Sequence, residues 1–239
     1  MDSHTICDNI QKFIGNPPGV DIGISDLSSL PSETRLGFTS AITVAVRLIS
    51  GIIGEIADQP TISYFAHYRA INRYIDDLTL KIGFFMESKG FKAHPIPASQ
   101  SDPKAYYAGV FSHKTAAHLS GLGWIGKNAL FIHNQWGSAV RLGTVLIDYD
   151  IESPKKIIPS LCGTCTLCKD ICPAQAIEGV NWTEDKKRKD LFDAHACSEY
   201  MKNHFQHIGR GSVCGLCIAV CPYTQCRQIT SDKKEKVNI

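Results

Sequence analysis

The 239-residue sequence lacks a long hydrophobic run, and its longest candidate is Ala41–Ile53. That run is interrupted by Thr43, Arg47 and Ser50, whereas a bilayer-spanning helix needs about 20 consecutive apolar residues. The N-terminus also lacks the basic and then apolar segments of a secretory signal peptide. Lys+Arg 25 against Asp+Glu 23 leaves a formal net charge of +2, so no overall basic field favours nucleic acid. These absences predict a cytoplasmic protein.

Cysteine is scarce in the first two thirds of the chain and abundant afterwards. Only Cys7 precedes residue 162, and the other nine of the ten cysteines follow. Disulfides are disfavoured in a reducing cytosol, and a chain of this size with 44% hydrophobic residues does not need them. Clustered cysteines in such a protein more often bind metal.

The first 150 residues alternate between helical and extended patterns. The β-branched residues of Ala41–Leu48 predict a buried strand. Apolar residues at spacings of 3, 4 and 7 predict a helix over Ile62–Lys89, ended by Gly90. We further predict a strand at Phe91–Ile96, a helix at Lys114–Leu122, and paired strands at Ala129–His133 and Val140–Asp148. This alternation indicates an α+β fold.

A Ser/Pro/Lys-rich segment, Glu152–Pro159, has the composition of a linker. It predicts two domains, residues 1–155 and residues 156–239. The second domain shows little hydrophobic periodicity, so we expect its order to come from something other than an apolar core.

The cysteine spacing in the second domain is that of bacterial ferredoxins. The run is Cys162-x2-Cys165-x2-Cys168-x3-Cys172-Pro173, which matches the C-x2-C-x2-C-x3-C-P pattern. Gaps of two residues let three thiolates converge on one cluster, while the fourth cysteine reaches a different cluster. Pro173 is predicted to start a helix at its first position, where no amide donor is needed.

A second copy of the pattern is incomplete. Cys214-x2-Cys217-x3-Cys221-Pro222 lacks its first cysteine, and Cys197, 17 residues upstream, can replace it. Crossed ligation then predicts two [4Fe-4S] clusters. One would be held by Cys162, Cys165, Cys168 and Cys221, and the other by Cys172, Cys197, Cys214 and Cys217. Zinc is the alternative, but zinc ribbons use two separated Cys-x2-Cys pairs. Cys7 and Cys226 belong to neither set. We expect Cys7 to be chemically inert and Cys226 to be a packing residue.

The sequence also contains the glycine pattern of dinucleotide-binding proteins, but without the preceding strand that such a site requires. Gly121–Gly126 spells G-x-G-x-x-G, but it follows a predicted helix rather than a strand. We therefore expect an acceptor other than a dinucleotide for the electrons of the two clusters.

Three segments resemble the epoxyqueuosine reductases, a family that shares its corrinoid-binding core with the reductive dehalogenases. They are Ser112–Asn128 (SHKTAAHLSGLGWIGKN), Gly137–Ser138 and Val140–Val145, which precede the double ferredoxin motif. The resemblance implies a nitroreductase-like α+β domain that binds cobalamin, followed by a small bacterial-ferredoxin-like domain with two [4Fe-4S] clusters. A flavin in the first domain is the alternative.

The resemblance also implies partners and site residues. An external flavodoxin or ferredoxin would supply electrons, and the substrate would be a tRNA epoxide, a small molecule or a corrinoid protein. Residues predicted to hold the cofactor are Ser112, His113, Gly123, Trp124, Gly126, Lys127 and Asn128. Tyr107 stands where the family has its catalytic aspartate, so Tyr106 or Tyr107 is a candidate proton donor. Lys114 would assist that tyrosine or bind an anionic group.

Two classes of function follow from these observations. In the first, the protein is a corrinoid-dependent reductase with a substrate of its own. In the second, it transfers electrons to a corrinoid or to another protein and has no small substrate. The absence of the family's aspartate favours the second class, and the retained Ser112–Asn128 segment favours the first.

Overall fold

The computed structural model describes residues 3–100, 107–151, 157–209 and 213–224. Residue contacts divide the chain into two compact units. Unit 1 comprises Met1–Arg47, Ala70–Gly123 and Arg141–Ile158, and unit 2 comprises Leu48–Arg69, Trp124–Val140 and Pro159–Ile239. This division differs from the predicted boundary near residue 155, because residues 48–69 and 124–140 group with the cysteine-rich segment.

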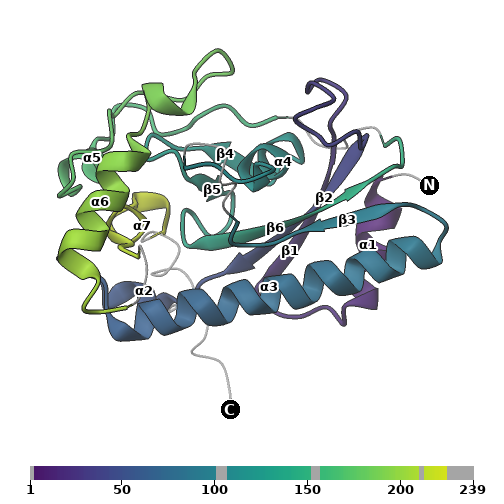
Figure 1. Ribbon diagram of the computed structural model, residues 1–239, viewed down its shortest axis with the longest axis horizontal. Coiled ribbons are helices and arrows are strands. Elements are labelled where there is room, and N and C mark those ends of the chain that lie inside the picture. The colour runs from purple at the N-terminus through teal and green to yellow at the C-terminus, as the bar shows by residue number, and fades with distance from the viewer. Residues whose placement is uncertain (1–2, 101–106, 152–156, 210–212, 225–239) are drawn as a thin grey trace. The chain divides into compact units, whose positions relative to one another are not determined.

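Unit 1 is built on a four-stranded sheet with the order β1-β2-β6-β3 (Figure 1). The strands are β1 (Val20–Asp26), β2 (Ser40–Arg47), β3 (Ala93–Ile96) and β6 (Val140–Ile147). β1 and β2 are antiparallel from Val20 opposite Val46 to Asp26 opposite Ser40, and β3 is antiparallel to β6. The predicted strands near 41–48, 91–96 and 140–148 are confirmed.

Helices cover both faces of this sheet. The helices of unit 1 are α1 (Ser3–Phe13), the larger part of α3 (Ile62–Ser88) and α4 (His113–Leu119). α1 and α3 pack on the face that carries Val44 and Val145. Ala116 of α4 packs with Ala41 and Leu146, whose neighbours in the strands point the other way. The mixed helix and sheet architecture predicted from the sequence is therefore confirmed.

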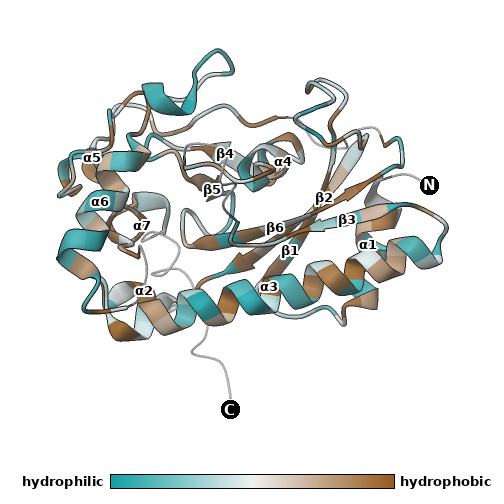
Figure 2. Cartoon of the chain, viewed as in Figure 1, coloured by the Kyte–Doolittle hydropathy of each residue, from teal (hydrophilic) through white to brown (hydrophobic). Residues whose placement is uncertain are grey.

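The long helix α3 follows from its hydrophobic spacing. Ile75, Leu78, Ile82 and Met86 lie one turn apart and are buried against the sheet. Figure 2 shows the resulting alternation of hydrophobic and hydrophilic residues along α3. The helix ends before Gly90, whose φ of +88° is the left-handed conformation that favours glycine.

Unit 2 contains shorter elements joined by long loops. They are α2 (Ser50–Gly54), β4 (Gly123–Ile125), β5 (Phe131–His133), α5 (Leu167–Asp170), the 3₁₀ helix η1 (Arg188–Asp190), α6 (Ala194–Phe205) and α7 (Leu216–Ala219). β5 pairs with β4 in a separate two-stranded sheet. The predicted pairing of residues 129–133 with 140–148 is wrong, because only the bridge between His133 and Gly137 closes that turn.

Helix length and composition also decide whether a helix can cross a membrane. Within the described ranges, no helix combines the length and the apolarity required to cross a bilayer.

Candidate metal centre

Four cysteines of unit 2 surround one cavity. Cys162, Cys165, Cys168 and Cys221 line a space of about 480 Å³. Three of them come from the first cysteine run, and Cys221 comes from the second, 49 or more residues further along the chain. This is the grouping that crossed ligation requires.

Electrostatic coupling shows that these four thiols are neighbours. Burial, together with the nearby Cys162, Cys221 and Cys165, raises the pKa of Cys168 to about 11. A thiol that is surrounded by thiols resists becoming a thiolate unless a cation compensates the charge. The environment of Cys168 is therefore suited to a thiolate bound to a positively charged metal centre.

A second group of thiols gathers around Cys217. Burial raises the pKa of Cys217 well above its usual range, and the thiols of Cys214, Cys197, Cys168 and Cys172 add to this effect. Burial also raises the pKa of Cys197 to about 12, again with contributions from Cys214 and Cys172. The four remaining predicted ligands thus lie close to one another, and they too come from both motifs.

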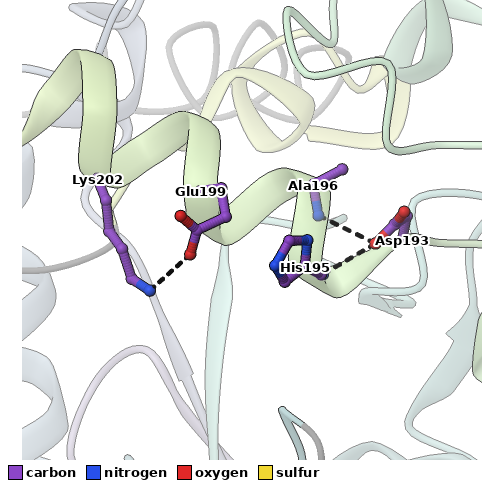
Figure 3. Close-up of polar contacts among 5 residues, drawn as sticks. All are labelled: Asp193, His195, Ala196, Glu199 and Lys202. Atoms are coloured by element: carbon purple, nitrogen blue, oxygen red, sulfur yellow. Dashed lines mark hydrogen bonds and ion pairs between the residues drawn. The ribbon is translucent and has the colours of Figure 1, made fainter.

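Local structure positions Cys197 on the first turn of α6. The Asp193 carboxylate caps this helix by accepting hydrogen bonds from the amides of His195 at 2.9 Å and Ala196 at 3.0 Å (Figure 3). One turn later, Lys202 Nζ donates to Glu199 at 2.8 Å. The cap fixes where the helix begins and hence where the Cys197 side chain emerges.

The two Cys-Pro sequences differ in structure. Pro222 begins a helical segment at residues 222–224, but Pro173 lies in a turn. The helix predicted after Pro173 is wrong, because Gln175 adopts a φ of +49° and breaks the helical path. Its amide bonds to the Cys172 carbonyl at 3.0 Å, which closes the turn.

The donor sets fit [4Fe-4S] clusters. Each cluster takes four cysteine thiolates, and each group supplies four. Zinc ribbons take their ligands from two separated Cys-x2-Cys pairs, whereas here three cysteines of one run and Cys221 line the same cavity. Among the residues that the structure describes, no trio of His, Cys, Asp or Glu is arranged around a single ion.

The segment Trp124–Val140 holds both cysteine motifs by hydrogen bonds. Lys127 Nζ donates to the Cys165 carbonyl at 3.0 Å, and Asn128 Nδ2 donates to the Cys217 carbonyl at 3.3 Å. Ser138 Oγ donates to the Ile218 carbonyl at 3.3 Å, and its amide donates to Thr224 Oγ1 at 3.1 Å. Adjacent side chains of one segment therefore fix loops that are far apart in sequence.

Close packing reinforces this attachment. Gly137 lies against the backbone of Tyr223 and Thr224, so closely that an added Cβ would come within 2.5 Å of it. The Trp124 indole meets the Tyr223 ring edge-on, with centroids 4.8 Å apart. The Tyr223 hydroxyl donates to the Leu161 carbonyl at 2.6 Å, which links the end of the second motif to the start of the first.

Five of the predicted cofactor residues lie in the glycine-rich segment that includes Lys127 and Asn128. Gly123, Trp124, Gly126, Lys127 and Asn128 are all buried. The hydrogen bonds of Lys127 and Asn128 go to cysteine loops, so these two side chains are engaged within the protein. This role could not be predicted from the sequence, because the partners lie 38 and 89 residues away.

The other predicted site residues belong to unit 1. Ser112 caps α4 by accepting from the amide of Thr115, Lys114 is half-buried, and Tyr107 is 37% exposed with a φ of +49°. Tyr106 lies outside the described residues. The catalytic roles assigned to these residues from sequence remain predictions.

His113 is held inside unit 1 by hydrogen bonds at both ring nitrogens. Nε2 donates to the Pro97 carbonyl at 3.0 Å, and Nδ1 lies 2.8 Å from Thr144 Oγ1. Burial lowers the pKa of His113 to about 4, more than the hydrogen bond to Pro97 raises it. The ring is therefore neutral near pH 7 and accepts the Thr144 hydroxyl proton at Nδ1.

Comparison with known proteins supports this assignment of the cysteines. A family model described as a 4Fe-4S double cluster binding domain matches residues 161–224. An epoxyqueuosine reductase from Atelocyanobacterium thalassa is 35% identical over 122 residues, which are 49% of this chain and 39% of the relative. The chain spans between 30% and 55% of the length of the curated relatives it matches.

Solved structures share the fold. A catabolic reductive dehalogenase in complex with 3-bromo-4-hydroxybenzoic acid aligns with a TM-score of 0.67 at 15% identity, over 90% of this chain and 32% of the dehalogenase. An epoxyqueuosine reductase with a modified tRNA stem loop aligns with a TM-score of 0.59 at 20% identity, over 95% of this chain and 67% of that protein. The chain is thus similar in sequence to epoxyqueuosine reductases over part of its length, matches a double-cluster domain at residues 161–224, and shares its fold with solved epoxyqueuosine reductases and reductive dehalogenases.

Proposed function

We propose that the protein is an iron–sulfur oxidoreductase whose two [4Fe-4S] clusters pass electrons to a bound corrinoid that reduces a substrate. The observation that carries the proposal is the gathering of Cys162, Cys165, Cys168 and Cys221 around one cavity. Both motifs contribute to that set, as in proteins that conduct electrons through two clusters. The matched double-cluster model over residues 161–224 supports the same conclusion.

The protein's own residues have defined tasks in this proposal. The eight cysteines supply thiolates, and Lys127, Asn128 and Ser138 hold the loops that carry them. This keeps the ligand geometry fixed while electrons enter and leave, which reduces the cost of reorganisation. An external flavodoxin or ferredoxin would be the electron donor.

The corrinoid part of the proposal rests on the resemblance to epoxyqueuosine reductases and reductive dehalogenases. A bound corrinoid would supply a strongly reducing metal centre for the substrate. Two of the side chains predicted to contact it, Lys127 and Asn128, bond instead to cysteine loops. We therefore do not expect these two side chains to provide such contacts.

The substrate proposed first is an epoxide on tRNA, since the curated relatives are epoxyqueuosine reductases. Tyr107 would donate the proton to the reduced carbon or oxygen, and its partly exposed side chain is accessible to a substrate. Removing a general acid typically costs about 10²–10⁴ in rate. The variant Tyr107→Phe should show such a loss, with unchanged iron content.

The second candidate function is electron transfer to a corrinoid without a small substrate of its own. It is favoured by one observation: a tyrosine occupies the position of the family's catalytic aspartate. Tyrosine is a much weaker acid than a carboxylic acid near neutral pH.

One experiment separates the two functions. The anaerobically purified chain is loaded with cobalamin, reduced, and given an epoxyqueuosine-containing tRNA stem loop. Conversion of the stem loop supports the reductase. Corrinoid reduction without conversion supports electron transfer, and failure to bind corrinoid at any concentration refutes both corrinoid-based functions.

A further inference from the structure

Lys127 is a buried cation beside the first group of cysteines. Its side chain is 5% exposed, and it lines the same cavity as Cys162, Cys165, Cys168 and Cys221. Lysine is almost never buried unless its charge is compensated. The structure must therefore offer this ammonium group a counter-charge.

The protein partner of Lys127 does not provide that counter-charge. Its Nζ donates to the backbone carbonyl of Cys165 at 3.0 Å, and a carbonyl carries only a partial negative charge. Within the described residues, Lys127 forms no ion pair with a carboxylate. A cluster with four thiolate ligands is a net anion and would lie in the cavity that Lys127 lines.

We propose that Lys127 raises the reduction potential of the cluster held by Cys162, Cys165, Cys168 and Cys221. This inference rests on the proposed function, because it requires that the cluster is present. Reduction adds one negative charge to the cluster, and a nearby positive charge stabilises the reduced form more than the oxidised form. Burial strengthens this effect, since little water screens the interaction.

The second group of cysteines has a different electrostatic environment. Arg188 lowers the pKa of Cys197, but Asp193 raises it, so two opposite charges act on the same thiol. Arg188 is also exposed, with its guanidinium 5.8 Å from the centre of the Phe192 ring. A buried lysine without a carboxylate nearby is thus a feature of the first group.

The test compares charge with hydrogen bonding at residue 127. Lys127→Gln keeps an amide donor for the Cys165 carbonyl and removes the charge, whereas Lys127→Arg keeps the charge. The matched control is Lys169→Gln, because Lys169 Nζ also donates to a backbone carbonyl, that of Glu178 at 3.1 Å, but the residue is exposed. Midpoints of both clusters are measured by redox titration followed by electron paramagnetic resonance.

We expect Lys127→Gln to lower one of the two midpoints and leave the other unchanged. At a fixed solution potential, the ratio of reduced to oxidised first cluster should fall about tenfold, which equals about 59 mV for one electron. Lys127→Arg should keep both midpoints near their wild-type values, because it retains the charge. Lys169→Gln should also leave both midpoints unchanged, because water screens the charge of Lys169.

Other results would overturn the proposal. Unchanged midpoints in Lys127→Gln would show that the charge has no effect on the cluster. An equal shift of a midpoint in Lys169→Gln would show that the effect of a lysine on the cluster does not depend on its burial. Loss of about four irons from Lys127→Gln would make the residue a structural support only. If the wild-type protein itself held fewer than about eight irons, the proposed function would fail before any variant is compared.

Discussion

At the scale of the residue, the crossed arrangement of the cysteines makes a prediction that local ligation does not. Cys168 and Cys172 are neighbours in one motif, but Cys168 lines the cavity with Cys162, Cys165 and Cys221, whereas Cys172 acts on the pKa of Cys197. Cys168→Ala and Cys172→Ala should each reduce the iron content from about eight to about four per chain. The double variant should lose nearly all iron, since it removes a ligand from each cluster.

The control for this experiment is Cys7→Ala. Cys7 packs against the core of unit 1, far along the chain from both motifs, and should retain about eight irons. Local ligation predicts a different outcome for the double variant, because both changes would then affect one cluster. About four irons remaining in that variant would rule out the crossed assignment.

His113 makes the stability of unit 1 depend on pH. Because its pKa is about 4 in the folded protein and about 6.5 when unfolded, the unfolded state binds more protons in this window. Stability should therefore be fully present above pH 6.5 and decrease as the pH falls towards 4. Between pH 7.5 and pH 5 the loss should be about 2 kcal/mol.

Denaturation of the wild type and of His113→Gln at both pH values measures this contribution. Acid also attacks iron–sulfur clusters, but that effect is common to both proteins and cancels in the difference. Glutamine keeps a donor for the Pro97 carbonyl and does not titrate. Equal pH dependence of the two proteins would contradict a buried neutral His113.

At the scale of the element, the segment Trp124–Val140 controls the attachment of both motifs. Gly137 has a φ of +61°, and an added Cβ would meet the backbone of Tyr223 and Thr224 within 2.5 Å. Gly137→Ala should therefore lower the free energy of unfolding by about 4 kcal/mol or more, whereas left-handed strain alone would cost about 1–2 kcal/mol. Chelator-induced bleaching of the clusters, together with unfolding curves, measures the effect.

Gly37 provides the matched control for Gly137. Its φ is +80°, but an added Cβ would have nothing within 4 Å. Gly37→Ala should cost only the backbone strain, about 1–2 kcal/mol, and should leave cluster bleaching unchanged. Similar losses in the two variants would show that the contact with residues 223–224 contributes nothing.

The same segment shows what the sequence could and could not predict. The helix α3 and the strands β2 and β6 follow from apolar periodicity, which is a local property of the chain. The strand β4 has only three residues, too few for a periodic signal, and it takes β5 as its partner in place of the predicted one. Pairing between strands depends on distant contacts that periodicity does not contain.

In the candidate site, too, local patterns could be predicted from the sequence and distant contacts could not. Cysteine spacing predicted the two groups of thiols because ligand geometry is encoded within each motif. The hydrogen bonds of Lys127 and Asn128 to Cys165 and Cys217 could not be predicted, since they join residues 38 and 89 positions apart. The position of Lys127 in the glycine turn was visible in the sequence, but its burial and its partner were not.

At the scale of the whole molecule, the composition of unit 2 determines how the protein should respond to loss of its clusters. Unit 2 includes Leu48–Arg69 and Trp124–Val140 as well as the cysteine-rich segment. Several of its large apolar side chains are exposed, among them Leu161, Leu167 and Val180. We expect cluster binding to supply much of the folding free energy of the cysteine-rich segment, to which these exposed residues belong.

Removing the clusters should consequently unfold more than the residues after Pro159. We expect oxygen or chelator treatment to open protease sites within residues 48–69 and 124–140 as well, because the hydrogen bonds of Lys127, Asn128 and Ser138 lose their ordered partners. The sheet of unit 1 should stay protected, since its core is formed by its own strands with α1 and α3. Limited proteolysis with mass spectrometry, before and after cluster removal, locates the cuts. Cleavage confined to residues beyond 159 would mean that the segment Trp124–Val140 folds without the clusters. Early cleavage in β1 or β2 would mean that the stability of unit 1 also depends on them.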